Sequence, residues 1–160
     1  MLDMIEHDDQ SKQFLMPGKL IIGTGQQHIT TILGSCVSVV ITDKKNLVWG
    51  MNHFVLPYKK DCLNSELGKY GNHSIELMLK QMEKMGGEKR NYQAKIYGGF
   101  NALSDCKTTI GHENIRIALS ILSGRQVPYK LCESLDVGGR KIIVNFPIGQ
   151  VSVEKIGGDL

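Results

Sequence analysis

The stretch "TTILGSCVSVVITD", from Thr30 to Asp43, carries the pattern that decides the fold. The run from Val37 to Thr42 is rich in β-branched residues, which is typical of a buried β-strand. Gly34 and Ser35 precede it, so the backbone can turn tightly there. Cys36 stands between the turn and the strand. Its thiol is either one more small buried hydrophobe or a nucleophile held at the junction.

Strand patterns and glycine turns continue on both sides of this stretch. Pro57 ends one of the strands, because proline cannot donate to a β-ladder. The polar, turn-rich loop that follows, residues 58–72, is of the length that often borders a site. Strands are expected within residues 18–43, 46–57, 92–100, 129–139, 140–147 and 149–156.

Two segments have the period of amphipathic helices instead. From His73 to Met85 apolar residues recur every three or four positions, and Gly86 follows. A second helix is expected from about Gly111 to Leu122. Strands and helices that do not alternate strictly favour an α/β fold, a layered α/β sandwich with a mixed, mostly antiparallel sheet and two main helices.

Length and composition indicate one globular domain. The chain has 160 residues, 41% hydrophobic and 22% charged, with a net charge of +3. This balance argues against nucleic acid as a partner, and no apolar run reaches the ~20 residues of a membrane span. We expect a polar tail over residues 1–15 and a single domain over residues 16–160. Without an export signal or paired cysteine motifs, a reduced protein of the cytoplasm is expected.

Cys36 has one histidine at a favourable distance along the chain. His53 lies 17 residues downstream, near the end of the next expected strand. Paired strands lie ~4.8 Å apart, so the two side chains could face each other across an antiparallel pair. A thiol needs such a neighbour to form its reactive thiolate at neutral pH. A structural histidine that is hydrogen-bonded within the core is the alternative for His53.

The residues before Cys36 supply the other parts that acyl transfer requires. Backbone amides around Gly34 and Ser35 could form an oxyanion hole. A hydroxyl of Thr30 or Thr31 could hold the second imidazole nitrogen, the orienting role of a third triad member. Since side chains alternate along a strand, only one of these threonines can point at His53. Six other cysteines and histidines carry no such pattern: Cys62, Cys106, Cys132, His7, His28 and His73.

The motifs resemble those of the CheD family, the chemoreceptor glutamine deamidases of bacterial chemotaxis. The resemblance rests on "TTILGSCVSVVITD" followed by "GMNHFVLP", and continues through "GKYGNHSIELMLKQMEKMG", "AKIYGGFNALSD", "IGHENI" and "DVGGRK". It spans the chain from about Gly18 to Ile156 in the family's order. The most specific element is L-G-S-C-V with G-x-x-H-x-x-L-P after it, because the spacing between cysteine and histidine is also kept.

The resemblance implies a catalytic trio and a substrate. Cys36 matches the nucleophile, His53 the general base and acid, and Thr30 the threonine that orients His53. The implied reaction is hydrolysis of glutamine side-chain amides on the cytoplasmic helices of methyl-accepting chemotaxis receptors, by a protein-glutamine glutaminase of the amidohydrolase class. No metal and no cofactor is implied. A CheC-type CheY-phosphate phosphatase is a second implied partner.

Two departures and two rival functions accompany this resemblance. The family often carries an arginine near "IGHENI", where this chain has His112 and Glu113, and the segment after "DVGG" is short because Arg140 follows at once. One rival is a non-catalytic CheD-like module that docks to a phosphatase or a receptor. The other is a thiol protease or amidotransferase, because a cysteine alone does not distinguish a side-chain amide from a backbone amide.

Overall fold

The computed structural model describes residues 2–5, 12–100, 109–134 and 138–156, which form two β-sheets and two long helices. The six-stranded sheet has the order β1 (Leu2–Ile5), β3 (Leu20–Thr24), β6 (Val48–Asn52), β5 (Val37–Asp43), β7 (Tyr92–Gly98), β8 (Tyr129–Ser134). The four-stranded sheet has the order β10 (Gln150–Ile156), β9 (Gly139–Phe146), β4 (Gln27–Leu33), β2 (Lys12–Phe14). The pairs β1–β3, β7–β8 and β2–β4 are parallel, and the others are antiparallel.

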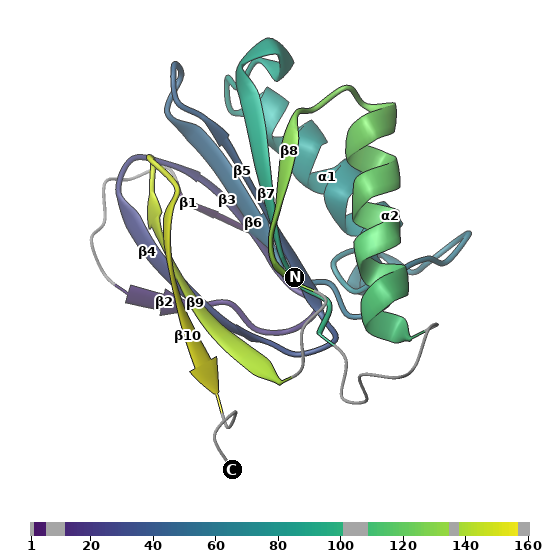
Figure 1. Ribbon diagram of the computed structural model, residues 1–160. Helices are drawn as coiled ribbons and strands as arrows, with labels where there is room; N and C mark the ends of the chain where they lie inside the picture. The colour runs from purple at the N-terminus through teal and green to yellow at the C-terminus, as the bar shows by residue number, and fades with distance from the viewer. Residues whose placement is uncertain (1, 6–11, 101–108, 135–137, 157–160) are drawn as a thin grey trace.

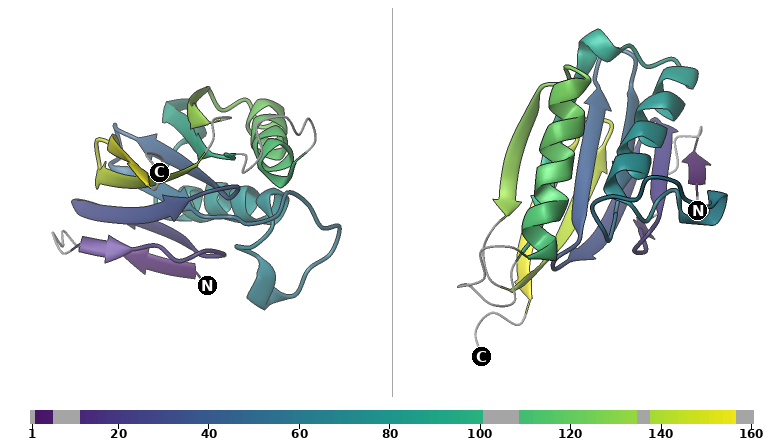
Figure 2. Two further views of the ribbon diagram at one scale, coloured as in Figure 1. Left: turned by 60° about the horizontal axis from the view of Figure 1, so that its bottom comes forward. Right: turned by 90° about the vertical axis from the view of Figure 1, so that its right-hand side faces the viewer.

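The helices α1 (Gly71–Lys84) and α2 (Ile110–Gly124) lie side by side on one face of the six-stranded sheet (Figures 1 and 2). Each helix buries one stripe, because its apolar residues recur with the helical period. These stripes consist of Ile75, Met78 and Met82 in α1 and of Ile115, Ala118 and Leu122 in α2. The short 3₁₀ helices η1 (Asn64–Glu66) and η2 (Lys89–Asn91) lie on either side of α1 in the chain.

The four-stranded sheet lies on the opposite face of the six-stranded sheet (Figure 1). The central strand β5 is therefore covered on both faces, and all of its residues are buried. Val37, Val39 and Ile41 belong to the core beneath the helices. Cys36 and Val40 pack in the second core, between the sheets.

The layered α/β sandwich, the mostly antiparallel strands and the two main helices are confirmed. The strands divide into two sheets rather than one, because an apolar strand pattern gives no indication of which strands pair. Within the expected tail, Leu2–Ile5 and Lys12–Phe14 form strands. The two segments of the expected polar tail thus belong to the sheets, because main-chain hydrogen bonds add β1 and β2 to the sheet edges. Of the helices that the structure describes, none is long and apolar enough to cross a membrane.

Candidate active site

Cys36 and His53 lie on the same face of the six-stranded sheet, between the two sheets. Val37 is bridged to Phe54, and Val40 pairs with Met51 in the same antiparallel register. This register puts Ser38 opposite His53, so Cys36 is the diagonal neighbour of the histidine. Diagonal Cα atoms are typically ~7–8 Å apart, within reach of long side chains. The expected face-to-face pair is therefore a diagonal one.

Thr31, and not Thr30, holds the imidazole of His53. Thr31 is fully buried, and its Oγ1 lies 2.6 Å from His53 Nδ1. Thr30 lies on the outer face of β4, beside a shallow hollow lined by Phe14 and Ile32. The assignment of Thr30 as the orienting residue is wrong for this structure. The alternation of β4 turns the odd-numbered positions, Ile29 and Thr31 among them, toward the second core.

The hydrogen bonds of Thr31 fix which nitrogen of His53 carries a proton. Thr31 Oγ1 donates its single proton to the carbonyl of Leu15, at 2.7 Å. It can then only accept from the ring, so Nδ1 of the neutral imidazole is the protonated nitrogen. Nε2 keeps a lone pair, and within the described residues this buried atom makes no hydrogen bond. The unprotonated Nε2 has the protonation state of a general base, and it makes no hydrogen bond to Cys36 in this structure.

Burial sets the charge state of both groups. His53 is 1% exposed, and desolvation lowers its pKa from 6.5 to about 4. Desolvation also raises the pKa of the half-buried Cys36 thiol, and the residue's own backbone N–H partly offsets this. From the sequence, a neighbouring histidine was expected to help the thiol form its thiolate at neutral pH. The structure favours a neutral thiol beside a neutral imidazole, because burial penalises both charged forms.

Two glycines at the end of β7, Gly98 and Gly99, form a close backbone contact with Cys36. The N–H of Gly99 donates to the Cys36 carbonyl at 2.9 Å, and the N–H of Phe100 donates to Gly34 at 2.8 Å. Gly98 has φ +98°, and an added Cβ would lie 2.2 Å from the Cys36 carbonyl oxygen. Any side chain at Gly98 would displace the backbone of Cys36. The sequence indicated only a turn here, because a glycine pair does not show what approaches it.

Besides the contact of Gly98 and Gly99 with Cys36, the contacts of Asn114 were not predicted from the sequence. This residue of α2 is fully buried, and its Nδ2 donates to the carbonyls of Ser35 and Val55, each at 2.9 Å. A signal for it exists, since Asn114 lies three residues after Gly111 and four before Ala118, on the buried stripe of α2. A polar side chain on an apolar stripe requires a buried partner.

Of the other described cysteines and histidines, only Cys132 packs against the core that Cys36 contacts. His73 lies in α1 and contacts the Lys59 carbonyl through Nε2, at 2.7 Å. Cys62 is in the polar loop before α1, and Cys132 is on β8. His28 is a half-buried residue of β4. Cys106 and His7 fall outside the described residues, as do residues 135–137, which lie between β8 and β9 in the chain.

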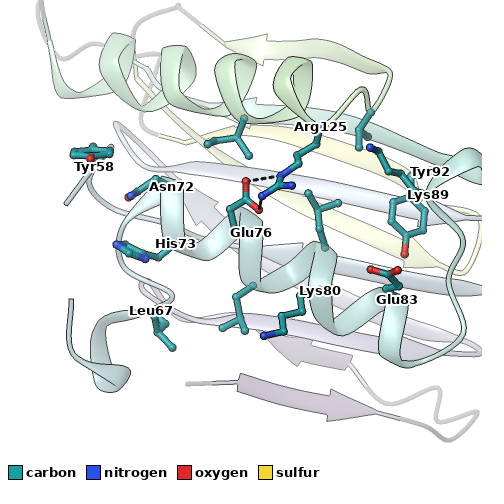
Figure 3. Close-up of a pocket in the computed structure, with 14 residues that line it drawn as sticks. Tyr58, Leu67, Asn72, His73, Glu76, Lys80, Glu83, Lys89, Tyr92 and Arg125 are labelled. Atoms are coloured by element: carbon teal, nitrogen blue, oxygen red, sulfur yellow. Dashed lines mark hydrogen bonds and ion pairs between the residues drawn. The ribbon is translucent and has the colours of Figure 1, made fainter. Parts of the chain in front are cut away.

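A separate groove of ≈ 790 Å³ lies on the helical side of the molecule (Figure 3). It runs between α1 and α2, where Glu76 and Arg125 form an ion pair at 2.7 Å. Tyr58 and His73 line one end. None of its lining residues is Cys36, Thr31 or His53. The six-stranded sheet separates this groove from the candidate site, so its volume is no measure of the site.

Comparison with known proteins identifies the family. The family model described as "CheD chemotactic sensory transduction" matches residues 55–155. A protein of Trichlorobacter lovleyi, named a probable chemoreceptor glutamine deamidase CheD, is 36% identical over 143 residues, 88% of each chain. A protein of that name from Borreliella burgdorferi is 34% identical, and the match covers 83% of this chain and 81% of the Borreliella protein.

Other matches involve longer or more distant proteins. The probable deamidase CheD of Ralstonia nicotianae is 31% identical over 89% of this chain, which spans only 62% of that relative's length. The fold is similar to the solved structure of Bacillus licheniformis YfiH, with a TM-score of 0.50. The match covers 84% of this chain and 64% of the YfiH chain. At 9% identity that structure shares the fold alone. The family model and the identity to relatives of similar length together show that this chain belongs to the CheD family.

Proposed function

We propose that this chain is a chemoreceptor glutamine deamidase. The domain, residues 16–160, would act in the cytoplasm and convert glutamine side chains of receptor helices into glutamate and ammonia, as a protein-glutamine glutaminase. One observation carries the proposal: Thr31 fixes His53 with Nδ1 protonated, and Nε2 is thereby free to accept a proton on the face of Cys36. The names of the relatives supply the substrate class.

In the first half of the reaction, His53 Nε2 removes the thiol proton as Cys36 Sγ attacks the carboxamide carbon. Both groups are neutral beforehand, so proton transfer and attack occur together rather than from a preformed ion pair. The tetrahedral oxyanion would be stabilised by backbone N–H groups of Gly34, Ser35 and Cys36. The imidazolium then protonates the departing nitrogen, so ammonia leaves and a thioester remains on Cys36.

In the second half, Nε2 takes a proton from water, and the resulting hydroxide attacks the thioester carbon. The C–S bond breaks, glutamate forms, and the proton returns to the sulfur. Thr31 accepts from Nδ1–H throughout, so it stabilises the imidazolium of both steps. Every step uses groups of the chain, water and the substrate amide.

The test is incubation of the full chain with receptor cytoplasmic fragments, followed by mass spectrometry of receptor peptides and measurement of released ammonia. The proposal predicts glutamine-to-glutamate conversion at particular residues, with the receptor backbone intact. Cleavage of the backbone would instead indicate a thiol protease. Receptor or CheC-type phosphatase binding without conversion would indicate the non-catalytic docking module.

A further inference from the structure

Asn114 connects the two segments that carry the proposed reacting groups. Its side-chain amide donates one proton to the carbonyl of Ser35, the residue before Cys36. It donates the other to the carbonyl of Val55, two residues after His53. We propose that Asn114 is a positioning residue, which sets the separation of Cys36 and His53 through this double hydrogen bond. The inference rests on the proposed deamidase reaction.

The amide orientation follows from its two partners. Carbonyl oxygens only accept hydrogen bonds, so the atom that faces both Ser35 and Val55 must be the nitrogen. Only an NH₂ group offers two donors from one short side chain. Serine or threonine would offer one proton, and alanine none. The side chain is 0% exposed, so water does not replace a lost bond without a rearrangement.

The start of α2 packs in a way that keeps Asn114 at this place. An added Cβ on Gly111 would lie 2.6 Å from the Gly99 carbonyl oxygen, so α2 approaches the glycine pair at the end of β7 closely. Gly99 in turn donates to the Cys36 carbonyl. The turn before β5 is thus held from two sides, through Gly99 and through Asn114. Of these contacts, only that of Asn114 also reaches the segment after His53.

The experiment compares Asn114→Ala and Asn114→Ser with Leu122→Ala in the full-length protein. Leu122 is fully buried on the same helix, about two turns farther along, and serves as the control for loss of stability alone. One readout is the kcat and KM for a receptor fragment. The other is the rate at which iodoacetamide labels Cys36 at neutral pH, measured on the Cys36 peptide so that the other cysteines do not interfere.

We expect Asn114→Ala to lower kcat on the order of 10²-fold with little change in KM, since displacement of a reacting group by ~1 Å can cost that much. Asn114→Ser, with one donor, should fall between this variant and the wild type. Labelling of Cys36 should become faster in both, because the turn opens. Leu122→Ala should lower the unfolding midpoint and leave kcat and labelling unchanged.

The inference is overturned if the Asn114 variants keep the wild-type kcat, or if Leu122→Ala loses as much. If the wild type releases no ammonia, the proposed function fails, and the labelling rates still decide whether Asn114 fixes the turn. Unchanged labelling in both Asn114 variants would then reject it.

Discussion

Replacement of Thr31 by valine keeps the shape of the side chain and removes only its hydroxyl. In the structure Thr31 Oγ1 makes two buried hydrogen bonds, at 2.7 Å to the Leu15 carbonyl and at 2.6 Å to His53 Nδ1. Valine would leave both partners buried without a bond, and each such group costs about 1–3 kcal/mol. We expect the free energy of unfolding to fall by roughly 2–6 kcal/mol.

The effect of this change on activity follows from the same two bonds. Without Thr31 Oγ1 to accept the hydrogen bond from Nδ1–H, the ring of His53 loses its orientation and its preferred tautomer. General base catalysis by Nε2 therefore weakens. Such catalysis contributes about 10²–10⁴-fold, and kcat/KM should fall by about 10²-fold or more. The assays are urea unfolding and glutamate formation on a receptor fragment, the latter below the temperature at which the variant unfolds.

Thr30→Val is the matched control for Thr31→Val. Thr30 lies on the outer face of β4, where a polar-to-apolar change at a half-exposed site typically alters stability by about 0.5 kcal/mol or less. Its activity should equal that of the wild type. If Thr30→Val abolishes activity and Thr31→Val does not, the orientation of β4 and the role of Thr31 described above are both incorrect.

Two further predictions concern pH and the glycine pair. The pKa of His53 is about 4 in the folded chain and 6.5 in model compounds, so between these pH values the unfolded state binds a proton that the folded state does not. The free energy of unfolding should therefore rise by about 3 kcal/mol as the pH increases from 4 to 6.5. His53→Gln should remove that rise. An acid limb of kcat/KM near pH 6.5 instead of 4 would contradict this burial. Gly98→Ala should unfold or inactivate the protein, since its Cβ meets the Cys36 carbonyl. Gly124→Ala, with no atom within 4 Å of its Cβ, should be neutral or stabilise by up to about 1 kcal/mol; equal behaviour of the two variants would refute the contact.

The local sequence pattern was sufficient to predict β5, the two helices and the sheet face on which Cys36 lies. The β-branched run after Cys36 predicted β5, and the three-to-four spacing predicted both helices within one or two residues. The approach of the next strand predicted that Cys36 and His53 share a face. These features depend on residues near in sequence, whose periods follow directly from backbone geometry.

Contacts between distant segments could not be predicted in this way. Thr31 and Thr30 are chemically identical neighbours. Which of them contacts His53 depends on which face of β4 meets the other sheet. The contacts of Asn114 join residues 79 and 59 positions apart, so no local pattern contains them. The neutral resting pair of Cys36 and His53 depends on burial, which the spacing of two residues does not reveal.

The rate of glutamate formation by Cys36→Ala, compared with the wild type on one receptor fragment, tests the account most directly. The substitution removes the sulfur of a half-buried residue and leaves Thr31 and His53 in place, so the variant should fold. We predict an unchanged unfolding transition and no detectable conversion of glutamine. Conversion at the wild-type rate by the folded variant would show that another group attacks the amide.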